Sequence, residues 1–464
     1  MSAIAGELCR ITVYGPDGRA DLAVPVSTTV ADLVPVLLSH TRRNPEAEEQ
    51  GSWILQRLGE TPLDPDGTPE TLDWLEGEQL YLRPAADPLP ELDFDDLADG
   101  IATSVAQRGD RWKPEYNAVL FRVLSGVVAL VIALALLGDG PTGLHAGFAL
   151  GLGVVFIAGA AVVAKKLADL MLTRLAGLAG CVFVGLAGLI TADGAADMAA
   201  LTPQGIVVAG GATAVSAAVL LILRRFVADD IPFAPFVTVF LVALALIVGV
   251  WLGSGFDLTP GRVAGVLATL FLGVVIFVPK VAIRAAFLRG PQLPRNAADL
   301  QQDIDPAPAD EVSARTATAD RYISVAMVSA AAVSVGSYPF ILAEPGWIGW
   351  TMVSLLAAGL LLRSRSFVGV WQRISLVTAG TVGLGLVVLF HAQRFPPEWR
   401  TVLLVGVLLA LFAVVQGALR PVNRRLLPIW GHLANIFDTV TGLAALPLLL
   451  QLLGVYAWAR GLAG

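Results

Sequence analysis

Residues 1–84 show the period-two alternation of strands, interrupted once by the spacing of a helix. Cys9, Ile11 and Val13 share one face of the first alternating run, and a Gly-Pro-Asp-Gly turn leads to the second. The pattern predicts strand, strand, helix, strand and strand, at 8–14, 22–26, 30–38, 53–58 and 79–82. Because a proline deep in a helix removes a hydrogen bond, we expect Asp32 to cap the helix and Pro35 to lie in its first turn. The pattern therefore predicts a small α+β domain.

From residue 118 onward the pattern changes to apolar runs of about 20 residues, long enough to cross roughly 30 Å of hydrocarbon as helices. Eleven runs are predicted, at 118–138, 144–164, 171–191, 204–223, 234–253, 262–279, 322–342, 347–362, 369–390, 401–419 and 430–453. The eighth run is short, so counts of ten or twelve stay open. The fold class is an α+β N-terminal domain followed by an all-α polytopic membrane bundle of 11 transmembrane helices.

The loops between these runs divide Lys and Arg very unequally between the two sides of the membrane. The side of residue 1 holds 21 of these residues beyond position 107, and the opposite side holds 4. Because cytoplasmic loops carry the excess of positive charge, the N-terminus is predicted to be cytoplasmic and the C-terminus to lie on the far side. The first residues lack a signal-peptide pattern, which agrees with this orientation.

Composition and charge narrow the class of protein. Hydrophobic residues make up 56% of the chain and charged residues 15%, against about 25% charged in ordinary globular domains. These values indicate an integral membrane protein and exclude a soluble enzyme, a disordered chain and a disulfide scaffold. Residues 1–117 hold 22 acidic and 9 basic residues, so nucleic acid is not an expected partner and a basic protein surface is.

Residues 85–117 form a predicted linker between the two parts. Acidic and hydrophobic residues alternate in it, and the candidate docking residues are Asp93, Phe94, Asp95 and Asp96. A solvated linker with one amphipathic turn is the alternative. Basic and aromatic side chains then precede the first span as a predicted membrane-interface collar, Arg111, Trp112 and Lys113.

Residues 280–321 form the only long connection between spans, and it is predicted to be cytosolic. It separates spans 1–6, at 118–279, from spans 7–11, at 322–464. Its first part, with Lys280 and Arg284, predicts an interfacial helix. Its second part, which includes Asp310, predicts a mobile acidic linker.

No pattern typical of an enzyme or a metal site is present in the sequence. None of the four lysines follows a glycine, which excludes a P-loop, and no histidine is followed by glutamate. The four histidines do not pair with each other or with cysteine at metal-ligand spacing. We therefore predict no catalytic, cofactor or metal site.

The last span carries the one acidic residue that is predicted to lie deep in the membrane. Asp438 shares a helical face with other polar residues, the full candidate set being His432, Asn435, Asp438 and Thr439. Such a stripe predicts a hydrogen-bonded seam against another span or subunit, because an unpaired charge in the bilayer is costly. A water-filled conducting path and packing within one protomer are the alternatives.

Small residues recur on the second span, where Gly143, Gly147 and Gly151 are spaced four apart. This spacing permits close helix packing. Ordinary packing within the chain and self-association both fit the pattern.

The N-terminal domain resembles ubiquitin-like β-grasp domains in its order of strands and helix and in its closing stretch, 71–83. It departs from conjugating proteins because Arg83-Pro84 leads into a linker with no terminal Gly-Gly. A tethered interaction module follows from this resemblance, the alternative being a small domain that only stabilises its neighbour.

The whole layout resembles the EccD family, the membrane core component of mycobacterial type VII (ESX) secretion systems. The similarity rests on the ubiquitin-like domain, the acidic run 92–98 leading to Trp112, eleven spans with a cytosolic loop after the sixth, and the ending 447–456. It implies a non-enzymatic inner-membrane subunit that dimerises, encloses lipid between its bundles and contacts a membrane-anchored ATPase and other core subunits. The expected partners are therefore a second copy, those subunits and phospholipid, with structural lipids allowed but no cofactor.

A secondary transporter with a regulatory ubiquitin-like domain is the alternative function. Inverted repeats, broken helices in corresponding positions and several midplane charges would favour it. The sequence shows one deep acid and no convincing repeat.

Overall fold

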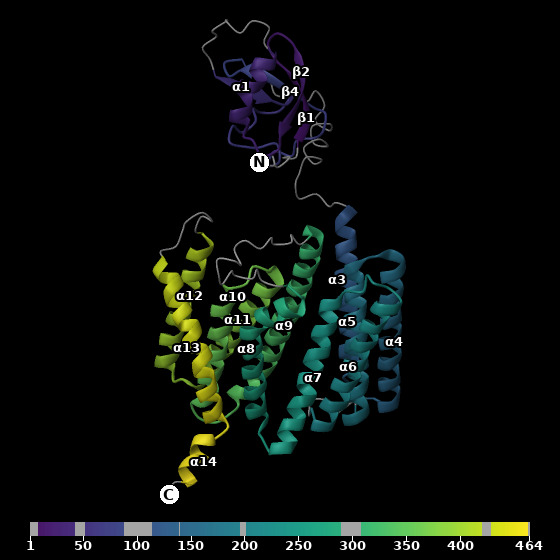
Figure 1. Ribbon diagram of the computed structural model, residues 1–464, viewed down its shortest axis with the longest axis vertical. Coiled ribbons are helices and arrows are strands. Elements are labelled where there is room, and N and C mark those ends of the chain that lie inside the picture. The colour runs from purple at the N-terminus through teal and green to yellow at the C-terminus, as the bar shows by residue number, and fades with distance from the viewer. Residues whose placement is uncertain are drawn as a thin grey trace, which may run out of the picture. The chain divides into compact units, whose positions relative to one another are not determined.

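The computed structural model describes residues 8–41, 52–87, 114–138, 140–194, 201–288, 308–419 and 428–462. Contacts divide the chain into two units, Met1–Pro114 and Glu115–Gly464. Figure 1 shows a mixed α and β unit at the N-terminus and a helical unit made by the rest of the chain.

The N-terminal unit is a four-stranded sheet with one helix, as the alternation predicts. Its elements are β1 (Leu8–Tyr14), β2 (Arg19–Pro25), α1 (Val30–Thr41), β3 (Trp53–Gln56) and β4 (Glu78–Pro84). The strand order is β2-β1-β4-β3, with β1 and β4 parallel and both outer pairs antiparallel. Pro25 lies on an edge strand, where its missing N–H breaks no ladder on the open side.

The core of this unit lies between α1 and one face of the sheet. Ile11 and Val13 of β1 are 2% and 0% exposed, whereas Arg10, just before Ile11, is exposed. Leu37 of α1 and Leu80 of β4 are both fully buried in the same cluster. The period-two and helical spacings therefore identified the buried face correctly.

The start of α1 differs from the prediction. Thr29 caps the helix: its hydroxyl accepts from the backbone N–H of Asp32 at 3.3 Å and donates to the Asp32 carboxylate at 2.7 Å. Pro35 consequently lies inside the helix and not in its first turn. Ala31 and Pro35 are both exposed, so the Ala31 carbonyl that loses its helical donor can be hydrated. The prediction that Asp32 is the cap was wrong because this solvent-facing site tolerates the proline.

The second unit is a bundle of long helices followed by one short helix. They are α3 (Pro114–Ala135), α4 (Thr142–Leu167), α5 (Leu170–Asp193), α6 (Pro203–Phe226), α7 (Phe233–Phe256), α8 (Pro260–Ala285), α9 (Ala309–Leu342), α10 (Ile348–Ser364), α11 (Val370–Arg394), α12 (Pro397–Ala418), α13 (Pro428–Leu452) and α14 (Val455–Leu462). Ten helices in the described part of the chain are long and apolar enough to cross a membrane. The predicted eighth span, α10, is a shorter apolar helix of 17 residues, so the count of eleven is approximate.

The helices group by packing in a different way from the division that the long loop makes in the sequence. One buried cluster joins α8 to α9, α10, α11 and α13, while α4, α5, α6 and α7 share another. α8 therefore packs with the helices that follow the loop, although the loop separates it from them in sequence. α7 connects the α4–α7 group to the group of α8 to α11 and α13, because it packs against both α8 and α9.

The connection between α8 and α9 is more helical than predicted. α8 continues through Lys280 and Arg284 to Ala285, so no separate interfacial helix starts at Lys280. α9 begins at Ala309, and Asp310 lies in its first turn. The expectation of a mobile acidic linker at Asp310 was wrong, since acidic residues stabilise the positive N-terminal end of a helix. Asp299, Asp303 and Asp305 of the predicted linker lie outside the described residues.

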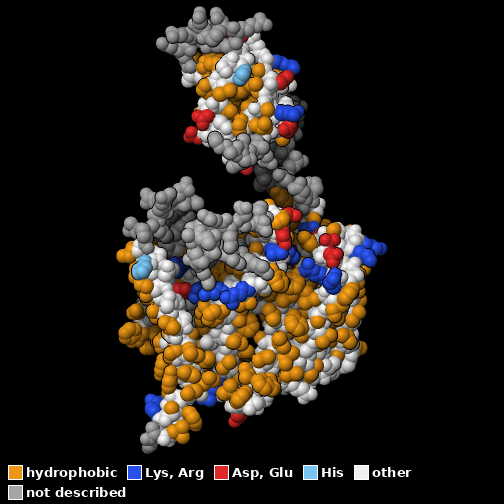
Figure 2. All heavy atoms as spheres, viewed as in Figure 1, with side chains coloured by type: hydrophobic (Ala, Val, Ile, Leu, Met, Phe, Trp, Pro, Cys, Tyr) orange, Lys and Arg blue, Asp and Glu red, His pale blue; other side chains and the backbone are white. Residues whose placement is uncertain are grey.

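Basic residues gather at one end of the helical unit, which we call the basic end. α3, α5, α7, α9, α11 and α13 begin there, and α4, α6, α8 and α10 finish there. Figure 2 shows hydrophobic side chains over the flanks of this unit and Lys and Arg toward the basic end. Apolar flanks with a charged rim are typical of a multi-pass membrane protein.

Candidate functional site

The predicted polar stripe of α13 meets α10 at the basic end. Asp438 forms an ion pair with Arg363 in the last turn of α10, with 3.2 Å between Oδ2 and Nη2. The two side chains are 18% and 23% exposed. Arg365 donates to the Asn435 side-chain oxygen at 3.2 Å. α10 and α13 are thus joined by two polar contacts in which both arginines come from the same helix end.

The remaining stripe residues do not reach α10 in this way. Thr439 donates to the backbone oxygen of Asn435, one turn earlier on its own helix, and its side chain is exposed. His432 is also exposed. Sequence reasoning did not predict Arg363 and Arg365 as partners of this stripe. The available signal was that both arginines follow the end of the shortest predicted span.

A second ion pair ties α3 to the start of α5. Arg122 donates to Asp169 at 2.6 Å, and the same carboxylate caps α5 by accepting from the backbone N–H groups of Met171 and Leu172. The hydrogen bond from the Leu172 amide, followed by that from Arg122, lowers the pKa of Asp169. One carboxylate therefore fixes both a helix end and its neighbour.

The glycines of α4 fall on two different faces. A methyl group added at Gly143, Gly147 or Gly151 would meet no described atom within 4 Å. In contrast, one at Gly153 would lie 3.0 Å from the backbone nitrogen of Val184 on α5. The close contact between α4 and α5 uses Gly153, and the three predicted glycines face outward from the described bundle.

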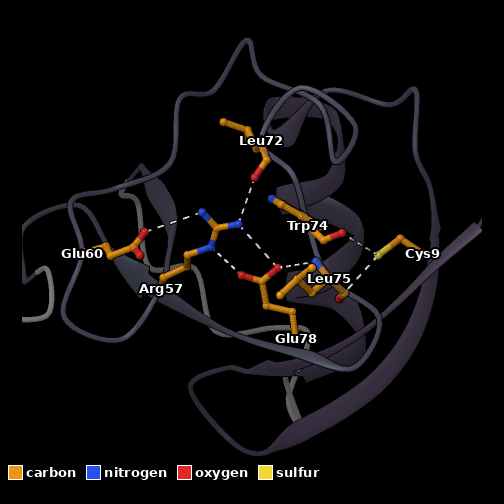
Figure 3. A network of polar contacts seen from close by, with 7 residues as sticks. All are labelled: Cys9, Arg57, Glu60, Leu72, Trp74, Leu75 and Glu78. Carbon is orange, nitrogen blue, oxygen red and sulfur yellow. Dashed lines mark hydrogen bonds and ion pairs between the residues drawn. The ribbon is translucent and has the colours of Figure 1, made fainter. Parts of the chain in front are cut away.

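A polar network fixes the surface of the N-terminal unit near the end of β3 (Figure 3). Arg57 binds the Glu78 carboxylate and donates to the backbone oxygen of Leu72 at 2.9 Å. Glu78 in turn accepts from the backbone N–H of Leu75 at 2.8 Å. The hydrogen bond with Glu78 raises the pKa of Arg57. The network holds the 72–78 loop, which lies just before β4, in one conformation.

Cys9 lies against the same loop but is not available as a reactive group. Its side chain is buried, and burial raises the pKa of the thiol. Its sulfur is 3.7 Å from the backbone oxygen of Leu75. By contrast, the side chain of Leu75 itself is 71% exposed, so the loop presents an apolar side chain on a fixed backbone.

Two predicted sites lie outside the described residues. They are the acidic docking segment, Asp93 to Asp96, and the interface collar, Arg111 to Lys113. In the part of the chain that the structure describes, no three His, Cys, Asp or Glu side chains gather as a metal site would require.

Both units match known protein families. Residues 117–462 match the family described as EccD-like transmembrane domain. Residues 8–82 match the family described as WXG100 protein secretion system (Wss), protein YukD. The boundary between the two matches falls within the predicted linker.

Relatives and solved structures match over nearly the whole chain. The ESX-3 secretion system protein EccD3, from two strains of Mycobacterium tuberculosis, is 24% identical over 504 residues, covering 99% of this chain and 99% of the relative. A structure described as protomer 1 of the ESX-3 core complex has a TM-score of 0.59 at 17% identity and covers 97% of this chain and 100% of that chain. A chain of the MycP5-free ESX-5 inner membrane complex, State II, has a TM-score of 0.52 at 17% identity, covering 89% and 100%.

The fold thus agrees with solved structures, and the membrane unit agrees with one family model along its full length. A YukD ubiquitin-like domain precedes it, as the β-grasp pattern predicts. The chain belongs to the EccD-like family of multi-pass membrane proteins.

Proposed function

We propose that this protein is a non-enzymatic scaffold subunit of an inner-membrane type VII (ESX) secretion complex. The observation that carries the proposal is the arrangement of a YukD-like unit and an EccD-like membrane unit in one chain. EccD3, which the chain resembles over its full length, is a secretion system protein. The work of such a subunit is to hold other subunits together, while a separate membrane-anchored ATPase supplies energy.

In this proposal the membrane unit pairs with a second copy of the chain. α12 supports this, because none of its described residues is buried and its exposed side chains include Leu408 and Phe412, 63% and 61% exposed. The outward face of Gly143, Gly147 and Gly151 offers a second place where helices can approach closely. Phospholipid fills apolar surface that the second copy leaves uncovered.

The ubiquitin-like unit docks the ATPase and other cytosolic parts, together with the acidic segment Asp93–Asp96. The net negative charge of residues 1–117 suits a basic partner surface. The fixed 72–78 loop, which exposes Leu75, supplies an apolar contact beside it. A short tether raises the local concentration of a docked subunit at the membrane.

In this proposal the basic end of the bundle faces the cytoplasm, with the N-terminus inside and the C-terminus in the periplasm. Thirteen Lys and Arg residues of the described bundle lie toward this end, against four toward the other, Arg262, Arg394, Arg400 and Arg460. This asymmetry is the one that the positive-inside rule requires.

The secondary-transporter alternative gains no support from Asp438. A coupling carboxylate must gain and lose its ion or proton, whereas Asp438 is held in an ion pair with Arg363. We therefore assign this pair to holding α10 and α13 together.

Co-purification from native membranes tests the proposal. The full chain, extracted in mild detergent, is expected to bring down a second copy and a membrane ATPase, identified by mass spectrometry. Deletion of residues 1–107 is expected to lose the ATPase while the bundle still inserts and pairs. An intact wild-type monomer that carries solute flux, with no associated subunit, would establish the transporter instead.

A further inference from the structure

A small pocket at the basic end, separate from the α10–α13 contacts, has a lining with only positive charge. It lies where α6 ends, α7 begins and α9 passes them, and its volume is about 200 Å³. The lining residues are Arg224, Phe233, Thr318, Arg321 and Tyr322. A lining that contains two arginines and no acidic residue provides the positive charge that an anion site needs.

Both guanidinium groups are held in place without being neutralised. Arg224 lies over the ring of Phe233, with its central carbon 5.4 Å from the ring centroid. Phe233 packs edge-on against Tyr322, with centroids 6.2 Å apart. Arg321 donates its Nε–H to the backbone oxygen of Ala317 at 3.2 Å. Among the described residues neither arginine forms an ion pair, so both keep donors for a ligand.

The acidic residues nearby do not compensate these charges. Asp229 and Asp230 are exposed in the turn between α6 and α7, and neither lines the pocket. Asp320 precedes Arg321 but accepts a hydrogen bond from Gln372 at 2.7 Å. It lines a different cavity of about 410 Å³, where the other charged residue, Arg363, is already paired with Asp438. Of these two pockets, the smaller is the one lined by two arginines that form no ion pair among the described residues.

The position of the pocket selects the source of the anion. Arg224 is in the last turn of α6 and Phe233 is the first residue of α7, so the pocket lies where the apolar spans meet the headgroup layer. Ile222 and Phe226, on either side of Arg224 in sequence, are 56% and 81% exposed. An apolar surface next to a pair of arginines at this depth suits a ligand with acyl chains and a phosphate.

We propose that Arg224 and Arg321 bind the phosphodiester group of an anionic phospholipid in the leaflet at the basic end. The aromatic pair Phe233 and Tyr322 forms the floor of the site, and the acyl chains lie along the exposed apolar flank of α6. The bound headgroup bridges α6 and α9, and so links the two packing groups of the bundle. The inference needs only the membrane placement of the chain and not its secretion role, so either can fail alone.

The test compares lipids with matched headgroups on the full-length chain in mild detergent. Dioctanoyl phosphatidylglycerol, dioctanoyl phosphatidylcholine and inorganic phosphate are titrated separately, and bound ligand is counted by native mass spectrometry. Phosphatidylglycerol is expected to bind about tenfold more tightly than phosphatidylcholine, because the choline ammonium meets only positive charge in the pocket. Equal binding of the two lipids, or inorganic phosphate binding as tightly as phosphatidylglycerol, would overturn the proposal.

Matched variants then separate this pocket from general attraction to the basic end. Arg224→Gln and Arg321→Gln are each expected to weaken phosphatidylglycerol binding about fivefold, which is the effect of about 1 kcal/mol per basic residue. Arg225→Gln, which removes the adjacent exposed charge outside the pocket, should change it less than twofold. Arg224→Lys keeps the charge and guards against misfolding, since it should recover most of the binding. Equal losses in the Arg224→Gln and Arg225→Gln variants would show diffuse attraction and rule the pocket out.

Discussion

At the scale of single residues, the energetic cost of a charged side chain in this bundle depends on whether a neighbouring helix end provides an oppositely charged partner. Asp438 is the only acidic residue that the sequence places deep in a span, and the hydropathy pattern alone does not reveal its partner. α10 is 17 residues long and ends beside it, so Arg363 can reach the carboxylate. The short length of α10 and the acidic residue within α13 therefore explain each other.

This pairing predicts a specific pattern of stability losses. Asp438→Asn and Arg363→Gln are each expected to lower the free energy of unfolding by about 1–3 kcal/mol, because each leaves the other half-buried charge without its partner. The double variant should lose clearly less than the sum of the two, since it removes both charges. Thermal unfolding of the full chain in detergent measures all three.

Additive losses would mean that the two groups do not interact. Arg373→Gln is the control at the same end, since Arg373 lies outside the Arg363–Asp438 pair. It should change the melting temperature little. If Asp438→Asn also releases associated subunits from native membranes, the pair supports assembly as well as the fold of one copy.

At the scale of elements, periodicity predicts where helices lie far better than which faces meet. The predicted spans 347–362 and 401–419 look alike in sequence. In the structure, α10 buries Met352, Val353 and Leu356, whereas α12 buries none of its residues. Lipid and a buried helix surface favour the same side chains, so apolar patterning cannot distinguish a lipid-facing helix from a central one.

The N-terminal unit shows the opposite case, in which water makes the pattern informative. The alternation of Cys9, Ile11 and Val13 with polar residues correctly identified the core face, because the other face is solvated. The error there was local, at Thr29 and Pro35, where the exposed face of α1 tolerates a lost hydrogen bond. Which residue caps α1 depends on whether the exposed face of the helix can accept a proline, and sequence spacing does not show this.

Close packing of α4 on α5 provides a test at the element scale. Gly153→Leu is expected to destabilise the bundle by several kcal/mol, because the added carbon would lie 3.0 Å from the backbone nitrogen of Val184. Gly151→Leu on the same helix meets open space and should leave an isolated copy unchanged. Melting temperatures of the two variants in detergent give the comparison.

The same pair of variants also tests the outward glycine face. Within the assembled complex, Gly151→Leu should weaken self-association if a second copy packs on this face. Unchanged pairing would assign the face to lipid and leave α12 as the stronger candidate for the interface. Equal destabilisation of isolated copies by both variants would contradict the packing of α4 on α5.

At the scale of the whole molecule, α10 decides the orientation of everything after it. At 1.5 Å per residue its 17 residues extend about 25 Å, slightly short of a typical hydrocarbon core of about 30 Å. Nevertheless Arg363, in the last turn of α10 at the basic end, pairs with Asp438 in the first half of α13. We therefore predict that α10 crosses the membrane, that the number of crossings is odd, and that the two termini lie on opposite sides.

Single cysteines test this orientation in the full chain, after Cys9 and Cys181 are replaced by alanine. Val368→Cys, at a position 98% exposed beyond α10, should resist a membrane-impermeant maleimide in spheroplasts and react after lysis. Glu398→Cys, in the first turn of α12 at the other end, should react without lysis. Because these sites lie on either side of α11, labelling at both from the same side would show that α11 does not cross. Exposure of residue 368 in intact spheroplasts would instead invert the bundle, and would move the ubiquitin-like unit away from any cytosolic ATPase.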